Sequence, residues 1–196
     1  IRRQRQMCIR DSPFSKMVAI RFHLMMCRRC PALERSLRET IDVLRAMLFY
    51  VDEFPEQLHH TKESQLLFPK VRERAPELTP VLARLERDHE AGERSIRELE
   101  HTLLAFEVMG EARRATFEQA VERYIRFYLD HMRVEEEHIL PAARRSFTAE
   151  DWVAVDAAFA ANQDPLTGHE AAAEFQPLFR KILMNAPAPI GLGPAH

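Results

Sequence analysis

Apolar residues recur along the chain at alternating spacings of three and four, the pattern of a helix that buries one face. The longest such pattern begins after Thr79-Pro80, a pair typical of a helix start, and ends near Gly110. Its buried stripe is expected to contain Leu82, Leu85, His89, Gly92, Ile96, Leu99, Leu103 and Phe106. The pattern therefore predicts one helix of about seven turns, ended by a glycine.

Two further stripes predict long helices before and after this one. The downstream stripe comprises Phe117, Val121, Tyr124, Tyr128, His131, Glu135 and His138. The upstream stripe comprises Leu44, Leu48, Val51, His59, Glu63 and Leu66. Proline lacks the N–H that a helix interior needs, so we expect Pro55 to kink the upstream helix and Pro141 to end or kink the downstream one.

The segment after residue 147 predicts two shorter helices. Thr148 and Asp151 have the spacing of a capping box and open an alanine-rich segment that runs to about residue 162. Residues 174–185 form a short amphipathic pattern, and residues 186–196 show none. The fold class is therefore all-α, an antiparallel four-helix bundle with a C-terminal helical pair.

We expect three parts along the chain. Residues 1–30 are atypical, and the opening run IRRQRQMCIRDS leads to the hypothesis that this segment is not native sequence. Sequencing the genomic locus tests that hypothesis, and an in-frame match to this run would refute it. Residues 31–146 form the predicted bundle, and residues 147–196 form a C-terminal helical extension and tail.

Composition and charge narrow the functional classes. The 196 residues carry a net charge of −2 with basic residues spread along the chain, which gives no electrostatic case for nucleic acid or an anionic membrane. The longest apolar run, MVAIRFHLMM, is interrupted by Arg21 and His23 and is too short to span a membrane. The CxxC of Cys27 and Cys30 alone is weak evidence for a redox or zinc site. A cytoplasmic location is the default expectation.

Histidines and glutamates stand where the periodicity predicts leucine. His59 and Glu63, and again His131 and Glu135, are four residues apart on predicted buried stripes. Side chains at this spacing share one helix face, so an imidazole and a carboxylate can converge on one cation. An unpaired buried carboxylate costs several kcal/mol, and a metal ion is the usual reason to bury both groups.

The two His/Glu pairs belong to an internal duplication. The stretch HHTKESQLLFP at 59–69 superimposes on HMRVEEEHILP at 131–141, with both ligand pairs and both prolines at one constant offset. A bundle built this way aims two equivalent pairs at its axis from different helices. His89 adds an imidazole from a third helix, and Gly92 one turn on leaves room for a ligand or a close helix approach.

The ordered set LHHTKE…LLFP, RDHE and HMRVEEEHILP resembles the hemerythrin-like HHE cation-binding family over about residues 40–145. The resemblance implies a four-helix bundle around two non-haem iron ions, bridged by carboxylates and ligated by histidines from all four helices. Carried over, His59, His89 and His131 are terminal ligands, and Glu63 and Glu135 are bridging ligands. Family members bind O2 reversibly, sense O2 or NO, or act in iron homeostasis and iron–sulfur repair.

The resemblance also implies a histidine on the first helix, for which the candidate is His23. If two antiparallel helices bring His23 level with His59, the turn between them falls near residue 41. The sequence there, RETIDVL, has neither glycine nor proline, so this ligand is the least certain of the set. The other candidate metal ligands do not depend on it.

Two alternatives stay open. Glu135-x-x-His138 and Glu56-x-x-His59 match the ExxH pattern of ferritin-like di-iron proteins, which implies an oxidase or peroxidase-type enzyme. In the second alternative, the bundle is metal-free and residues 148–185 dock a partner or a second copy of the chain. Whether the protein is an enzyme is left undecided, and O2 or NO is the expected small ligand.

Three remaining positions receive plainer expectations. His60 points about 100° from His59, so we expect it beside the site or at the surface. His101 falls off its stripe and is expected in solvent, and Glu93 is expected to form a salt bridge.

Overall fold

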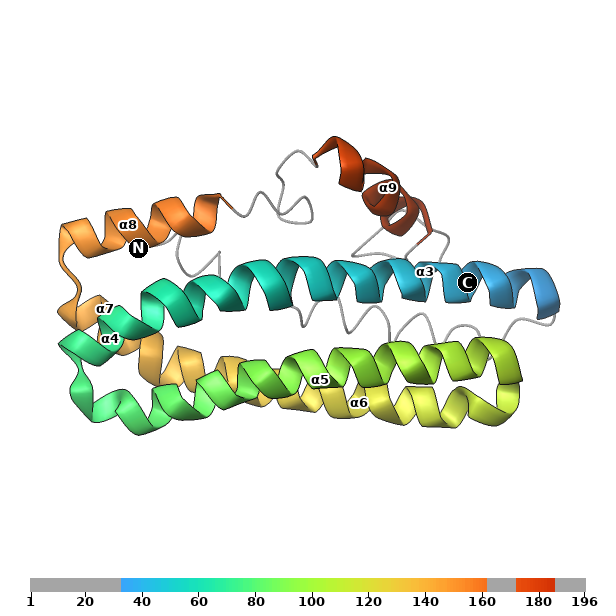
Figure 1. Cartoon of the computed structure of the whole chain (residues 1–196), viewed down its shortest axis with the longest axis horizontal. Helices are drawn as coiled ribbons and strands as arrows, with labels where there is room; N and C mark the ends of the chain where they lie inside the picture. The colour runs from blue at the N-terminus through green and yellow to red at the C-terminus, as the bar shows by residue number, and fades with distance from the viewer. Residues whose placement is uncertain (1–32, 162–171, 186–196) are drawn as a thin grey trace.

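The computed structural model describes residues 33–161 and 172–185, and its regular elements over those ranges are all helical, which confirms the predicted fold class. Among the three long helices of the described chain, the second runs antiparallel to the first and the third, and two shorter helices lie along the outside of the first (Figure 1). His23 and the first helix expected to carry it fall outside the described residues. The family's first-helix ligand therefore stays a prediction.

The first long helix is continuous from Leu33 to Arg74. It consists of α3 (Leu33–Val51), the π-helical segments η1 (Asp52–His60) and η2 (Glu63–Leu67), and α4 (Phe68–Arg74). A turn near residue 41 is excluded, because that residue lies inside α3. The helix also passes through Pro55, since the wider π-helical turn spans this position. A short 3-10 segment, η3 (Pro76–Leu78), follows.

The third long helix repeats the construction of the first. It consists of α6 (Glu111–Val134), the π-helical segment η4 (Glu135–Ile139) and α7 (Leu140–Ser146). In both helices a π-helical segment of 5 residues starts at a glutamate, and a helix of 7 residues with proline near its start follows. Of the two outcomes expected at Pro141, an end of the helix is excluded, because the chain stays helical to Ser146. The duplication seen in the sequence is thus a duplication of backbone geometry.

The second long helix, α5 (Thr79–Met109), confirms the predicted stripe, because all eight of its members are buried. Thr79 is the first helical residue rather than the N-cap, and its hydroxyl donates a hydrogen bond of 2.7 Å to the Pro76 carbonyl. The helix ends at Gly110, whose φ of 70° favours glycine. The amide of Gly110 still donates to the Phe106 carbonyl, and α6 begins at the next residue.

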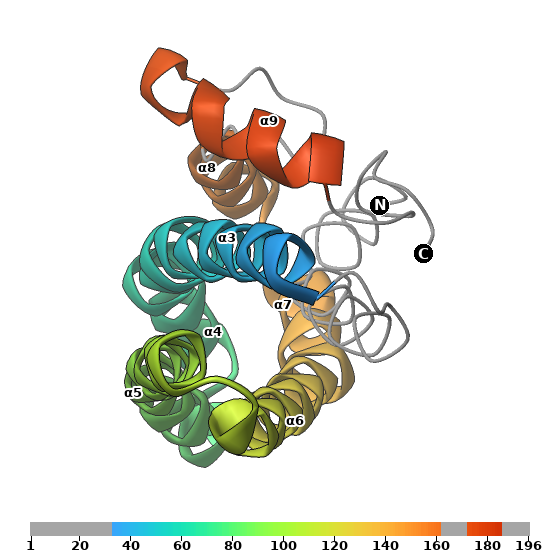
Figure 2. The ribbon, with the colours of Figure 1, turned by 90° about the vertical axis from the view of Figure 1, so that its right-hand side faces the viewer.

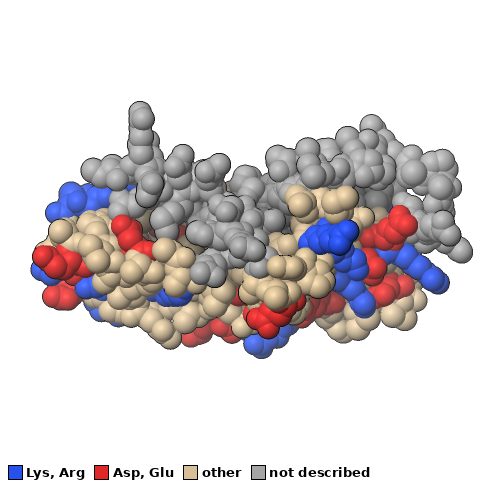
Figure 3. All heavy atoms as spheres, turned by 90° about the horizontal axis from the view of Figure 1, so that it is seen from above, with Lys and Arg blue, Asp and Glu red and all other residues tan. Residues whose placement is uncertain are grey.

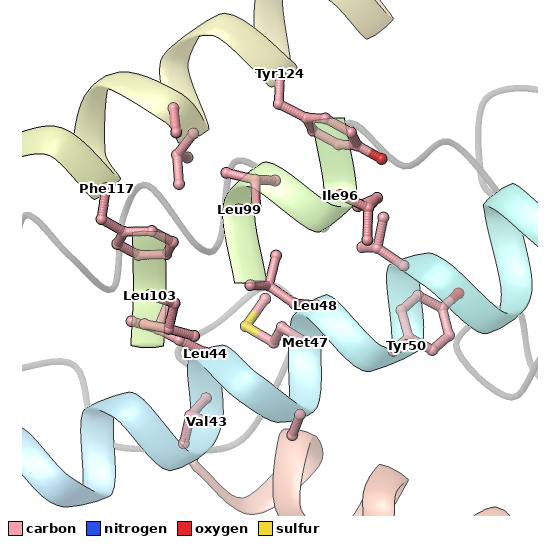
Figure 4. Close-up of a cluster of buried hydrophobic side chains, with 14 of the residues drawn as sticks. Val43, Leu44, Met47, Leu48, Tyr50, Ile96, Leu99, Leu103, Phe117 and Tyr124 are labelled. Carbon is pink, nitrogen blue, oxygen red and sulfur yellow. The ribbon is translucent and has the colours of Figure 1, made fainter. Parts of the chain in front are cut away.

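Two separate apolar cores hold the long helices together. The first joins α3, α5, α6 and α9, and Figure 4 shows Leu48, Leu99 and Tyr124 of three helices pointing into it. The second joins α4, α7 and the start of α5, with Phe68, Leu82 and similar residues fully buried. Along each long helix, the stretch between the two cores carries polar side chains. This polar layer is where the predicted ligands lie.

The C-terminal helices pack on the first long helix at different places. Helix α8 (Ala149–Ala160) starts with the predicted capping box, in which Thr148 and Asp151 each accept from the other's backbone amide. Its Asp151 accepts a hydrogen bond of 2.6 Å from Lys70 of α4. After η6 (Ala173–Phe175), helix α9 (Gln176–Asn185) buries Phe179 and Ile182 in the first core. Figures 1 and 2 show α8 and α9 on the same side of α3.

Acidic and basic side chains are intermingled on the described surface, as the face in Figure 3 shows. This mixture agrees with the small net charge of −2. Within the described residues, no helix is both long and apolar enough to cross a membrane.

Candidate metal centre

Four buried side chains from the three long helices meet in the polar layer between the two cores. They are His60, Glu63, His89 and His131, and one donor atom from each lies within 4.8 Å of the others. Metal–ligand bonds to nitrogen and oxygen are roughly 2.0–2.2 Å, so donors on opposite sides of one cation are about 4 Å apart. The group therefore needs only a small contraction to surround a cation.

Glu63 has one carboxylate oxygen turned to each side of this layer. Its Oε1 lies 3.0 Å from His59 Nε2, and its Oε2 lies 3.4 Å from His89 Nε2. His59 and Glu63 come from the same helix at i,i+4, whereas His89 comes from α5. A carboxylate that faces two imidazoles with its two oxygens has the arrangement of a bridging ligand.

The second His/Glu pair meets the first across the bundle. His131 Nε2 lies 3.3 Å from Glu135 Oε1, and His131 Nδ1 lies 3.6 Å from Asp88 Oδ2 on α5. The side chain of His131 is 2% exposed, and that of Glu135 is 14% exposed. The ring centre of His131 lies 4.9 Å from that of His89. The predicted pairs of both duplicated helices therefore face one interior layer.

Several of these donors lack a hydrogen bond. Among the described residues, 5 buried atoms have no partner: Glu63 Oε2, His89 Nε2, Glu135 Oε1 and both ring nitrogens of His131. Their contacts at 3.3–3.6 Å are too long or too poorly directed for hydrogen bonds. Each such atom costs about 1–3 kcal/mol, so together they cost on the order of 5–15 kcal/mol, as much as a whole domain's stability. A cation satisfies these atoms at once, so the residues present fit a metal.

A family model of the hemerythrin HHE cation-binding domain matches residues 20–143. The chain belongs to this family. The matched range contains the five described residues assigned to the centre and also His23. Neither the curated proteins nor the solved structures compared with the chain gave a significant match.

The pKa values of the ionisable side chains at this hemerythrin-like site follow from burial and from neighbouring charges. Burial opposes the charge on Glu63, but His59 and the other imidazoles outweigh it and hold the pKa well below its usual range. Burial and the neighbouring Glu63 raise the pKa of Glu135. Burial alone would lower the pKa of His131, yet the Glu135 carboxylate raises it to about 9. The pKa values of the two glutamates are thus shifted in opposite directions although the sequence duplicates them.

The structure corrects the expectation for His60. Its side chain is buried at 5% exposure and belongs to the close group of donors, whereas the sequence pattern placed it beside the site or at the surface. Its Nδ1 lies 3.1 Å from Oε2 of Glu56, which is also buried. Burial lowers the pKa of His60, and Glu56 partly offsets this. The i,i+4 spacing of Glu56 and His60 was the sequence signal that could have revealed this pair.

His59 lies at the edge of the centre, 22% exposed and against Glu63. Its ring also makes an edge contact with Phe159 of α8, with the ring centres 5.1 Å apart. The hydroxyl of Ser64 lies 2.9 Å from His89 Nδ1 and so fixes that ring with Nε2 toward Glu63. The sequence pattern did not single out Ser64, because serine on a helix is more often a surface residue.

The ferritin-like ligand pattern is not supported. His138 was expected on the buried stripe, but its side chain is exposed, because the π-helical segment from Glu135 shifts the register of the positions that follow. An exposed His138 cannot share a buried cation with Glu135. The plainer expectations for His101 and Glu93 are confirmed, since His101 is exposed and Glu93 pairs with Arg97 at 3.8 Å.

Two pockets approach the centre from different directions. An apolar pocket with a cavity volume of about 60 Å³ lies between the bundle and α8, with His59, Glu63 and Glu135 in its wall. Its other wall includes Trp152 and Phe159. A polar pocket with a cavity volume of about 170 Å³ is lined by Glu56, His60, Thr61, Ser64, Gln65, His89 and Glu93. Polar and apolar ligands would therefore reach different sides of the same centre.

Proposed function

We propose that the protein binds two non-haem iron ions in this layer and uses them to bind or sense a small diatomic ligand, O2 or NO. The observation that supports two ions is Glu63, whose oxygens face His59 on one side and His89 on the other. The proposed ligands among the described residues are those that the sequence predicts there, His59, Glu63, His89, His131 and Glu135. The sixth predicted ligand, His23, lies outside the described residues. A role in iron homeostasis or stress response is compatible with the same centre.

The donor set suits iron in chemical type. Imidazole and carboxylate ligands bind iron well, and the 5 unsatisfied buried atoms are nitrogens and oxygens of these two kinds. When bound, iron would supply redox chemistry and an open position for a diatomic ligand. The protein's own part is to fix the rings and carboxylates, as Ser64 does for His89, and to keep water away through the two apolar cores.

The apolar pocket supports a small uncharged ligand. It reaches the side of the centre formed by His59 and Glu135, and most of its remaining lining is aliphatic or aromatic. An uncharged diatomic molecule partitions into such a pocket more readily than an ion does. Helix α8 forms the outer wall and is held by the ion pair between Lys70 and Asp151. Helix α8 thus sets how the ligand reaches the centre.

A second candidate, a di-iron oxidase or peroxidase-type enzyme, is favoured by the polar pocket on the other side of the centre. This pocket has a cavity volume of about 170 Å³ and reaches His60 and His89, so it offers a small polar substrate such as a peroxide a path to the donor side chains. Turnover of peroxide or consumption of an organic substrate by the iron-loaded protein would favour the enzyme. Reversible binding of O2 or NO without turnover would favour the binding protein.

The test is metal content, an absorption spectrum and thermal stability on protein purified without chelator from iron-replete cells. We expect about two irons per chain. Removing them should lower the melting temperature, because a ligand at 100 times its Kd contributes about 2.7 kcal/mol. Glu63→Ala should abolish the paired centre, whereas His138→Ala, an exposed histidine nearby, should bind iron as the wild type does. A folded protein with no metal and no response to iron would refute the proposal.

A further inference from the structure

The ring of His60 lies among the donor side chains. It stacks on the ring of His89 with centres 4.3 Å apart and planes inclined by 9°, and its centre lies 5.6 Å from that of His131. Only 5% of His60 is exposed. Three imidazoles from three different helices therefore share one small buried volume. Such crowding of buried polar rings needs a reason.

Glu56 sets the orientation of His60. Its Oε2 lies 3.1 Å from His60 Nδ1, and its Oε1 accepts hydrogen bonds from the hydroxyl groups of Tyr124, at 2.7 Å, and of Tyr128. The Glu56 side chain is 1% exposed, so these partners replace its hydration. With Nδ1 held by Glu56, Nε2 is the nitrogen of His60 that remains for another partner. A carboxylate behind an imidazole is the usual support of a metal-binding histidine.

Gly92 of α5 makes this support possible. A Cβ at residue 92 would lie 2.5 Å from Tyr128 Oη, 2.9 Å from Glu56 Oε2 and 3.1 Å from Glu56 Oε1. Any larger residue would push the carboxylate away from His60. The sequence thus has a glycine on α5 where the Tyr128 hydroxyl and the Glu56 carboxylate occupy the space that a Cβ would need.

We propose that His60 is a metal ligand through Nε2, and that Glu56 is the positioning residue that holds its ring. This inference rests on the proposed function and goes beyond the ligand set implied by the family resemblance. It gives the described residues four imidazoles around Glu63 and Glu135, those of His59, His60, His89 and His131. The centre then has one imidazole more than the sequence predicts among the described residues, and this count does not depend on His23. This additional imidazole belongs to the residue that directly follows His59 in the chain.

The experiment uses isosteric variants of the full chain. His60→Asn keeps an N–H donor near the position of Nδ1 for Glu56 but removes Nε2, so it separates ligation from a structural hydrogen bond. Glu56→Gln keeps the volume of the positioning residue and removes its charge. His138→Ala is the matched control, because His138 is an exposed histidine. Cobalt(II) and iron(II) titrations give affinity and stoichiometry, and the cobalt visible spectrum reports the number and type of ligands.

We expect His60→Asn to fold like the metal-free wild type, to bind both metals more weakly and to change the cobalt spectrum. Glu56→Gln should weaken binding by about 10–100-fold, the usual effect of losing the partner behind a metal-bound histidine. Wild-type affinity and an unchanged spectrum in His60→Asn would overturn the inference and leave a structural role. A wild type that takes up neither metal would instead overturn the proposed function itself. If His60→Asn does not fold, the effect of Glu56→Gln on affinity and spectrum decides.

Discussion

Replacing Gly92 by alanine tests the close approach of α5 to the Glu56 group. At an open helical position this change stabilises a protein by about 1 kcal/mol, because alanine is the better helix former. Here the added methyl group would lie 2.5 Å from Tyr128 Oη and 2.9 Å from Glu56 Oε2. Overpacking of this kind costs about 1–3 kcal/mol. The shifted carboxylate also weakens the hydrogen bonds that it accepts, which offsets the helix-propensity gain of about 1 kcal/mol.

We therefore expect Gly92→Ala to destabilise the protein by about 1–3 kcal/mol, which reverses the sign of the propensity effect. For a chain of this size that is a fall in melting temperature of roughly 2–12 °C. The assay is thermal and denaturant unfolding of the metal-free protein, followed by circular dichroism. Iron affinity should fall as well, because Glu56 no longer holds His60 in place.

The matched control is Arg94, an exposed residue on the same helix. Comparing Arg94→Gly with Arg94→Ala isolates the effect of helix propensity. The Arg94→Ala variant should be more stable than the Arg94→Gly variant by about 1 kcal/mol. A double-mutant cycle with Tyr128→Phe, which removes the nearest clashing atom, should show a coupling of about 0.5–3 kcal/mol. If Gly92→Ala stabilises the protein as much as alanine does at residue 94, the close approach is absent and the reasoning fails.

Two further predictions concern the C-terminal helices. The Lys70 ammonium and the Thr148 amide hold the pKa of Asp151 at about 2 against an ordinary 3.8, so its stabilising effect is present above 3.8 and disappears towards 2. Asp151→Asn should therefore destabilise α8 near neutral pH but not at pH 2, as followed by the fluorescence of Trp152, the chain's single tryptophan. Phe179→Ala should cost about 3–5 kcal/mol in denaturant unfolding, whereas the 43% exposed Leu183 should change stability by less than about 0.5 kcal/mol when replaced by alanine. An equal effect at both positions would mean that α9 is not part of the core.

Much of the fold follows from local sequence rules. The buried stripe of α5, the glycine at its end and the capping box of α8 each depend on residues close together in the chain, and all were predicted correctly. Neither Pro55 nor Pro141 ends its helix, because a π-helical segment spans Pro55 and another, Glu135–Ile139, lies just before Pro141. Single-residue rules describe α-helical geometry and do not anticipate a π-helical segment.

The same π-helical segments explain the errors at the site. Periodicity placed His138 inside and His60 beside the centre, because it assumed 3.6 residues per turn throughout. Over residues 52–60, 63–67 and 135–139 the turn is wider, which moves later side chains around the helix axis. His60 is consequently buried and His138 exposed. The donor types and the helices that carry them were predictable, but the exact set of inward-facing side chains was not.

The duplication also accounts for the asymmetry of the centre. At the constant offset that aligns His59 with His131, Glu56 of the first helix aligns with Tyr128 of the third. These two residues are hydrogen-bonded to each other across the bundle, so the equivalent positions have complementary rather than identical chemistry. His60 has a methionine, Met132, at its equivalent position. The duplicated helical segments therefore supply both His/Glu pairs. The differences at these two positions give one half of the centre an additional imidazole and an additional carboxylate.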